Sequence, residues 1–145
     1  MDLPPGLQLT VEDRPSARDE DLLGDGLGDY NAAFLRDNSY AYFGIFVRDE
    51  AAAIRGGLIG YVYAGWLFVK YLWVHADLRR SGIGRGLLAE AERRAADLGC
   101  HSVWLDTFSF QAPEFYRKLG YREFAHLDYP PDHQRIFLKK PLIAE

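Results

Sequence analysis

The sequence predicts an α/β (α+β) fold with a central mixed, mostly antiparallel sheet of about six to seven strands and flanking helices. Three strand-like segments, residues 40–47, 54–63 and 66–74, follow one another through short turns, as in an antiparallel meander. A helical pattern and another strand-like segment come next, and this order predicts a right-handed β-α-β crossover between two parallel strands. Two further strand-like segments near the end of the chain complete the expected sheet.

The other elements follow in chain order. Residues 7–11 alternate apolar and polar side chains, which predicts a first strand. Residues 16–34 have a helical pattern, which we expect in two pieces because glycines interrupt it between residues 24 and 28. The crossover helix is expected from about residue 84 to 98, ending at Gly99. The expected strand after it, a short helix and the last two strands lie at residues 102–107, 111–119, 121–127 and 134–138.

Length and composition limit the classes of protein. The chain has 145 residues, 48% of them hydrophobic, which favours a single domain spanning residues 1–145. A formal charge of −4 and a pI near 5.6 argue against a nucleic-acid partner. The single cysteine, Cys100, cannot form a disulfide within the chain, which suits a reducing compartment. No signal-peptide pattern or membrane-spanning apolar run is present, so we expect a cytoplasmic protein without a membrane partner.

Charge is divided unevenly along the chain. Residues 1–40 carry a net charge of −6 and the remainder carries +2. A solvated acidic helix face would explain this division, and so would an electronegative side that attracts a cationic amine. Acidic residues around the glycines at 24–28 exclude an anion site there, and the ligand spacing of a calcium loop is missing. No metal site is expected.

A glycine-rich turn joins the third strand of the meander to the crossover helix. Its sequence, R-R-S-G-I-G at residues 79–84, places two glycines at a helix N-terminus, where amide N–H groups lack partners and the helix dipole is positive. Such a point binds phosphate. The spacing fits neither a dinucleotide fingerprint, which needs glycine at Leu87, nor a nucleoside-triphosphate loop, which needs Gly-Lys-Ser or Gly-Lys-Thr. An ordinary turn with solvated arginines is the alternative interpretation.

Two motifs in order resemble those of a known family. The segment L-W-V-H-A-D-L-R-R-S-G-I-G-R-G-L-L at residues 72–88 resembles the acetyl-CoA-binding motif of the GNAT superfamily of N-acetyltransferases. The segment Q-A-P-E-F-Y-R-K-L-G-Y at residues 111–121 resembles that family's second signature. The resemblance is strong over about residues 56–121. It implies a GNAT-like sheet and transfer of an acetyl group from acetyl-CoA, the co-substrate, to a primary amine of a small molecule or peptide.

The resemblance also implies roles for particular residues. Tyr116 matches the family's proposed general acid, which protonates the departing thiolate. Ser109 stands where many members carry an asparagine that contacts the cofactor, and a serine hydroxyl at this position can still donate a hydrogen bond. The backbone of the strand before the turn is expected to bind the pantetheine arm, and the turn to bind the pyrophosphate. The expected cofactor-binding residues are therefore Leu72, Trp73, Val74, Arg79, Arg80, Ser81, Gly82, Ile83, Gly84, Arg85 and Ser109.

The general base and the acceptor site are less determined by the sequence. Some members carry a glutamate on the strand before the turn, but residues 67–71 contain none, so a water chain is favoured. Other candidate bases are Asp106, Glu114, His75 and His126. The loop that carries Tyr129, Asp132 and His133 is a candidate lining of the acceptor pocket, or a plain proline-stiffened connection.

Two other functions stay open at this point. The chain could be a non-catalytic acyl-CoA-binding sensor, or a protein that binds a different nucleotide. Exposed aromatic residues on the last strands would also support a homodimer.

Overall fold

The computed structural model describes residues 1–37 and 39–142. These residues separate into two compact units, Met1–Arg36 and Asp37–Glu145, and each unit is described by itself. The expectation of a single domain over residues 1–145 stays a prediction.

The first unit contains helix α1 (Ala17–Asn31). The hydroxyl of Ser16 caps its N-terminus by accepting a hydrogen bond from the backbone N–H of Asp19 at 3.1 Å. The helix continues unbroken past its three glycines, so the expected division into two pieces is wrong. Each glycine lowers helix stability by about 1 kcal/mol relative to alanine, but its N–H and carbonyl still pair.

Residues 7–11 form no strand, which corrects a second expectation. A strand is stable only when a neighbouring strand pairs with its backbone N–H and carbonyl groups. No strand occurs among the described residues of the first unit, so an alternating side-chain pattern alone does not produce one there.

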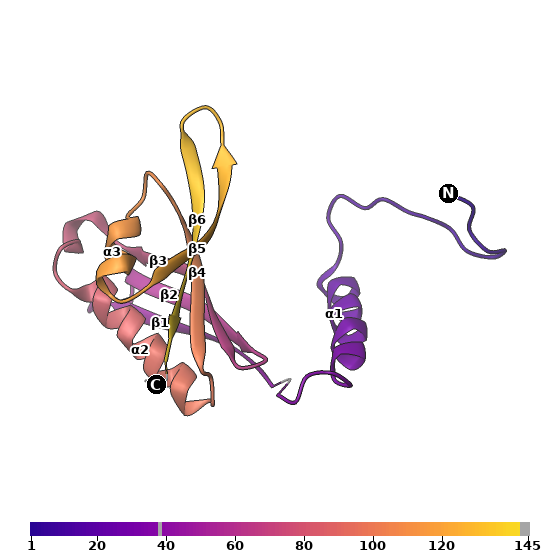
Figure 1. Ribbon diagram of the computed structural model, residues 1–145, viewed down its shortest axis with the longest axis horizontal. Coiled ribbons are helices and arrows are strands. Elements are labelled where there is room, and N and C mark those ends of the chain that lie inside the picture. Colours follow the sequence, from indigo (N-terminus) through magenta and orange to yellow (C-terminus); the bar gives the residue numbers. More distant parts are fainter. Residues whose placement is uncertain (38, 143–145) are drawn as a thin grey trace. The chain divides into compact units, whose positions relative to one another are not determined.

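The second unit contains a six-stranded sheet in the order β1-β2-β3-β4-β6-β5 (Figure 1). Strands β3 and β4 are parallel, and every other neighbouring pair is antiparallel. The predicted mixed, mostly antiparallel sheet is thus confirmed. The strands are β1 (Tyr40–Arg48), β2 (Ile54–Tyr63), β3 (Trp66–Val74), β4 (Ser102–Phe108), β5 (Arg122–Tyr129) and β6 (His133–Pro141).

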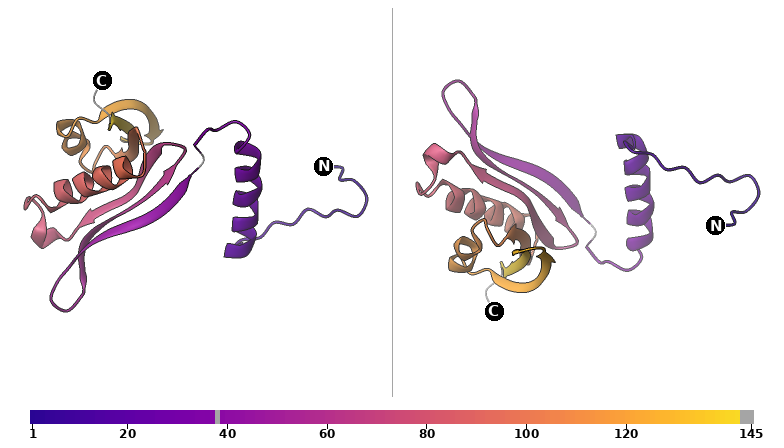
Figure 2. Two further views of the ribbon diagram at one scale, coloured as in Figure 1. Left: turned by 90° about the horizontal axis from the view of Figure 1, so that it is seen from below. Right: turned by 90° about the horizontal axis from the view of Figure 1, so that it is seen from above.

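The helices of this unit lie on one face of the sheet. Helix α2 (Ile83–Asp97) connects β3 to β4 and packs along β1, β2 and β3, which confirms the predicted crossover (Figure 2). It ends at Asp97 with Leu98 as its C-cap, and Gly99 just beyond has a φ of 88°, the left-handed conformation that glycine adopts most readily. The 3-10 helix η1 (Ala76–Leu78) follows β3, and helix α3 (Pro113–Lys118) follows β4.

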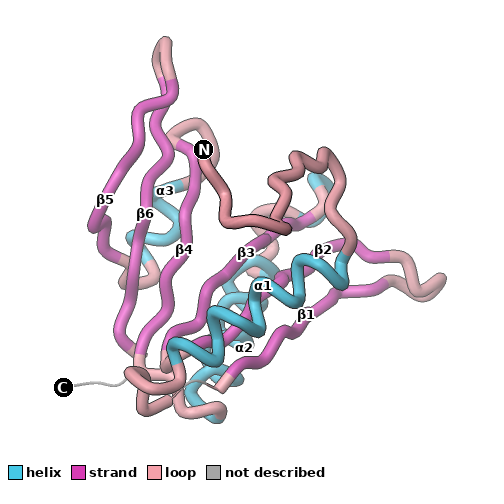
Figure 3. The backbone as a smooth tube through the Cα atoms, turned by 90° about the vertical axis from the view of Figure 1, so that its right-hand side faces the viewer, coloured by secondary structure: helices cyan, strands magenta, loops and turns pink. Residues whose placement is uncertain are grey.

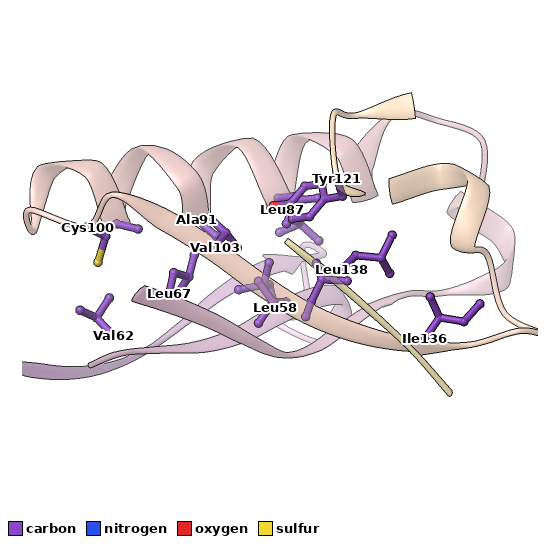
Figure 4. Packing of buried hydrophobic residues seen from close by; sticks show 14 residues of the cluster. Leu58, Val62, Leu67, Leu87, Ala91, Cys100, Val103, Tyr121, Ile136 and Leu138 are labelled. Carbon is purple, nitrogen blue, oxygen red and sulfur yellow. The ribbon is translucent and has the colours of Figure 1, made fainter. Parts of the chain in front are cut away.

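The hydrophobic core lies between α2 and the sheet. Alternate residues of the central strands are buried there, such as Leu67 on β3 and Val103 on β4, which share the core with Leu87 and Ala91 of α2 (Figure 4). Side chains between these positions point to the opposite face of the sheet. The two faces therefore differ in composition, and the opposite face carries many aromatic rings.

Strands β3 and β4 separate partway along their length. They pair from Trp66 opposite Ser102 to Val69 opposite Leu105, and beyond this point β3 continues to Val74 without pairing to β4. A β-bulge on β3 at Lys70 coincides with this point, because Val69 and Tyr71 face consecutive residues of β2. A bulge bends its strand, which explains why the strands are side by side at one end and apart at the other (Figure 3).

Glu92 of α2 joins the helix to β6 through a part-buried polar network. Its carboxylate accepts hydrogen bonds from Lys140 Nζ at 2.7 Å and from the Tyr121 hydroxyl at 3.2 Å. The Glu92 side chain is only 15% exposed, so losing it would leave a partly buried ammonium and hydroxyl without this partner. We expect Glu92→Ala to lower the free energy of unfolding by about 2 kcal/mol, measured by urea denaturation.

The matched control is Glu90→Ala on the same helix. Glu90 is 47% exposed and pairs with Arg93, which also contacts Asp97. An exposed pair of this kind contributes about 0.5 kcal/mol or less, so the loss should be correspondingly small. Equal losses for the two variants would contradict the role given to the Glu92 network.

Candidate active site

The gap between β3 and β4 leaves one edge of β3 available to a ligand. Beyond the bulge, β3 still pairs with β2 on its other side, up to Val74 opposite Gly56. The backbone groups of Leu72, Trp73 and Val74 that would face β4 in a continuous sheet therefore border the gap. An extended ligand can bind such an edge as an added strand does.

The glycine-rich turn continues from the open end of β3 into α2. Gly82 is the N-cap of α2 and has a φ of 86°, and no side chain caps the helix there. The first N–H groups of α2 are therefore left for an external acceptor, with the positive end of the helix dipole behind them. Arg80 also has a positive φ, of 64°, which is uncommon for a residue with a side chain.

Polar side chains of the turn hold it against the end of β3. Arg79 Nε donates to the carbonyl oxygen of Val74 at 3.3 Å, and the Ser81 hydroxyl donates to the carbonyl oxygen of Leu78. Arg80 and Arg85 are exposed, as an arginine must be to reach a phosphate in solution. The predicted turn residues thus share one loop beside the unpaired edge of β3.

Tyr116 lies on α3, at the same end of the sheet. A Cβ built on Gly84 of α2 would lie 3.6 Å from Cζ of Phe115 and 3.8 Å from Cγ2 of Val74, so α2, α3 and β3 converge there. Tyr116 is half-buried against the core, with ring contacts to Phe115 and Tyr121. Burial and then the negative charge of Asp106 raise the pKa of its hydroxyl to about 12, so the hydroxyl keeps its proton at neutral pH.

A concave aromatic surface occupies the sheet face opposite α2. Side chains from β2, β3, β4 and β6 line an open cavity of about 550 Å³, among them Tyr61, Phe68, Trp104 and Phe137. The ring centroids of Phe68 and Trp104 lie 4.2 Å apart. A cavity of this volume fits a small molecule.

Comparison with known proteins agrees with this geometry. Residues 7–121 match the model of the acetyltransferase (GNAT) family. The chain belongs to the GNAT family. It is therefore an acetyl-CoA-dependent N-acetyltransferase, and these matches give the sensor hypothesis no support.

Individual relatives match most of the chain. This chain is 44% identical over 95 residues to blasticidin-S acetyltransferase from Streptomyces morookaense, and the match covers 64% of this chain and 70% of that protein. It is 31% identical over 121 residues to the acetyltransferase Atu2258 from Agrobacterium fabrum, covering 83% and 88%. The crystal structure of an acetyltransferase from Bacillus cereus is 33% identical, with a TM-score of 0.77, covering 91% of this chain and 97% of that chain.

Ser109 departs from the asparagine expected of a GNAT enzyme, and its hydroxyl has a structural partner. Ser109 Oγ accepts a hydrogen bond from the backbone N–H of Gln134 at 3.0 Å, and its own N–H donates to the Gln134 carbonyl at 2.8 Å. These bonds fix the end of β4 to β6. A role for Ser109 in binding the cofactor stays a prediction.

Gln111 is a residue whose role the sequence did not reveal. Its side-chain oxygen accepts from the backbone N–H of Phe108 at 2.7 Å and from the Thr107 hydroxyl at 3.0 Å. It thereby closes the turn between β4 and α3 and positions the helix that carries Tyr116. The sequence pattern that could have indicated this role is the position of Gln111 two residues before Pro113, at the start of a helix. That pattern does not specify which groups the side-chain amide contacts.

The four candidate bases differ in their surroundings. Glu114 is 70% exposed and pairs with Arg117, and His126 is 51% exposed beside Glu123. His75 Nδ1 accepts from the backbone N–H of Asp77 at 3.2 Å. Asp106 is 17% exposed and lies where the gap opens, and its charge acts on the Tyr116 hydroxyl.

The loop between β5 and β6 is shorter than the sequence suggested. Strand β5 extends to Tyr129 and strand β6 begins at His133, so residues 130–132 connect them. Asp132 and His133 line a second open cavity of about 440 Å³ that also includes Ser109, while the Tyr129 ring packs edge-on against Phe108 at 5.0 Å. A role of this loop in acceptor binding stays a prediction.

In the part of the chain that the structure describes, no helix is both long enough and apolar enough to cross a membrane.

Proposed function

We propose that this enzyme acetylates a primary amine of a small molecule, binding acetyl-CoA along the β3 edge and at the N-terminus of α2. One observation carries the proposal: the unpaired edge of β3 and the uncapped N-terminus of α2 meet at the same end of the sheet. A pantetheine arm needs backbone partners and a pyrophosphate needs N–H donors with positive potential, and this place offers both.

Acetyl-CoA supplies an acetyl group that is activated as a thioester. Backbone groups of Leu72 to Val74 would orient it, and the N–H groups of the turn up to Gly84 would bind the pyrophosphate. Gly82 suits this task because its open surroundings leave room for a phosphate. Exposed Arg80 and Arg85 would add positive charge.

Tyr116 would donate the proton that the departing thiolate requires. Because burial raises the pKa of this hydroxyl, it carries its proton at neutral pH and has that proton to donate to the departing sulfur. The attacking amine must first lose a proton, since an aliphatic amine has a pKa of about 10.4. With no glutamate on β3 after Val69, water takes that proton in our proposal.

The aromatic cavity opposite α2 supports a small molecule as the acceptor. Its volume suits a ligand of drug size, and the faces of Tyr61, Phe68 and Trp104 attract a cationic amine. The blasticidin-S acetyltransferase that this chain resembles is named for a small-molecule substrate. The homodimer suggested by exposed aromatic residues stays a prediction.

The test is thiol release from acetyl-CoA over a panel of polyamines, aminoglycosides, blasticidin S, amino acids and peptide N-termini. We expect release with at least one small cationic amine and no release without an acceptor. Calorimetry with CoA alone checks the cofactor site separately. Release with peptides only would overturn the proposed acceptor class, and absence of CoA binding would overturn the proposed cofactor site.

A further inference from the structure

Asp106 is the first residue of β4 beyond the part that pairs with β3. The last paired residue is Leu105, opposite Val69, so Asp106 stands where the gap opens. Leu105 and Thr107 are buried toward α2, and Asp106 therefore points to the other face, as Trp104 does. Two residues along a strand span about 7 Å, so the Asp106 carboxylate lies between the aromatic cavity and the gap.

The carboxylate is largely shielded from water and only partly engaged. Its side chain is 17% exposed, and Oδ1 accepts a hydrogen bond from Arg135 Nε at 2.9 Å. No donor among the described residues hydrogen-bonds to Oδ2, so this oxygen is available to another donor. Arg135 is 35% exposed and its ring partner is Phe137, at 5.3 Å.

A purely structural role accounts poorly for a carboxylate at this place. An ion pair between neighbouring strands contributes little when one partner is partly solvated, and shielding a carboxylate from water is costly. The charge of Asp106 also acts on the hydroxyl of Tyr116, which approaches from the α2 side of the sheet. The gap therefore has a proton donor on one side and a carboxylate on the other.

We propose that Asp106 binds the positive charge of the acceptor amine and so selects cationic amines at the mouth of the gap. This inference rests on the proposed function, since it names a residue that recognises the acceptor of that reaction. Asp106 Oδ2 accepts a hydrogen bond from the ammonium group while the body of the acceptor lies over Trp104 and its neighbours. Asp106 holds the acceptor while water takes the proton of the amine, and the neutral amine still donates an N–H to Oδ2 as it attacks.

The test compares Asp106→Asn with Arg135→Gln, which remove opposite members of one ion pair. Both variants lose the pair, so a purely structural role predicts the same direction of change. The proposal predicts opposite behaviour: Asp106→Asn raises KM for a cationic acceptor by about tenfold or more, whereas Arg135→Gln leaves it unchanged or lowers it. KM for acetyl-CoA and calorimetric CoA binding should be unchanged in both variants.

Further measurements distinguish the proposed role of Asp106 from a loss of stability and from a failure of the proposed function. Thermal unfolding of both variants measures any shared loss of stability, and Asp106→Glu, which keeps the charge, should restore part of the acceptor affinity. A rise in acceptor KM in both variants, or in neither, would overturn the inference. Absence of turnover in the unmodified enzyme with every amine would instead overturn the proposed function, and this result is obtained before any substitution is made.

Discussion

Replacing Tyr116 with phenylalanine should lower kcat by about 100-fold while leaving CoA binding unchanged. The substitution removes the hydroxyl that we assign to protonation of the thiolate but keeps the ring, which packs against Phe115 and Tyr121. Steady-state thiol release gives kcat, and calorimetry with CoA gives the dissociation constant. The pKa of about 12 adds a pH test: the neutral hydroxyl is the favoured form, so Tyr116 should cause no loss of kcat as the pH rises from 7 to about 10.

The control for this variant is Tyr121→Phe. Tyr121 is also a core tyrosine with a raised pKa, caused first by burial, but its hydroxyl donates to Glu92 and lies outside the proposed chemistry. Its loss should reduce stability and leave kcat within about twofold, because it breaks a hydrogen bond of the core only. If both variants lost kcat to the same extent, Tyr116 would have no special role as a proton donor.

Introducing a negative charge at Gly82 should weaken acetyl-CoA binding by about 10- to 100-fold, as expected for like charges separated by a few ångströms near a protein surface. The informative pair is Gly82→Asp and Gly82→Asn. Asp and Asn adopt the left-handed φ of 86° more readily than other residues with a side chain, and the strain that remains is shared by the two variants. Both residues are common helix N-caps, and they have nearly the same shape. They differ in charge alone, so the ratio of their KM values for acetyl-CoA isolates the electrostatic effect of the site.

The same two variants separate cofactor binding from folding. Aspartate near a helix N-terminus stabilises the helix by about 0.3–1 kcal/mol, so Gly82→Asp should unfold at an equal or higher temperature than Gly82→Asn. A more stable protein with weaker acetyl-CoA binding is not explained by damage to the fold. Equal KM values in the two variants would show that the pyrophosphate does not bind at this turn.

The sequence predicted the second unit well because its local patterns and its tertiary contacts agree. The crossover from β3 through α2 to β4 was predictable since the buried faces of all three elements, including Leu67, Leu88 and Val103, repeat at the right periods. The position of Tyr116 and of the turn at Gly82 also followed from the sequence, although their roles were inferred from resemblance. The partners of the Gln111 and Asp106 side chains did not follow. The Gln111 amide bonds to Thr107 and Phe108 through a turn whose geometry no sequence pattern specifies, and the partner of Asp106, Arg135, is distant in sequence.

The first unit was predicted less well, and for a related reason. The glycines between residues 24 and 28 lower helix propensity, but a good N-cap at Ser16 and favourable acids in the first turn keep α1 continuous. The alternation at residues 7–11 is compatible with a strand, yet a strand also requires a partner. Local pattern therefore indicated what these segments could form and not what they do form.

The bulge at Lys70 has a consequence for how this enzyme can change over evolution. The bulge opens the β3–β4 gap through the backbone, whereas the proposed acceptor face is made of side chains such as Tyr61 and Trp104 that point away from α2. Substitutions on that face can alter the cavity without closing the gap, so donor and acceptor recognition are free to diverge independently. A lineage that keeps one bent strand can thus retain a single acetyl donor while exchanging one amine target for another.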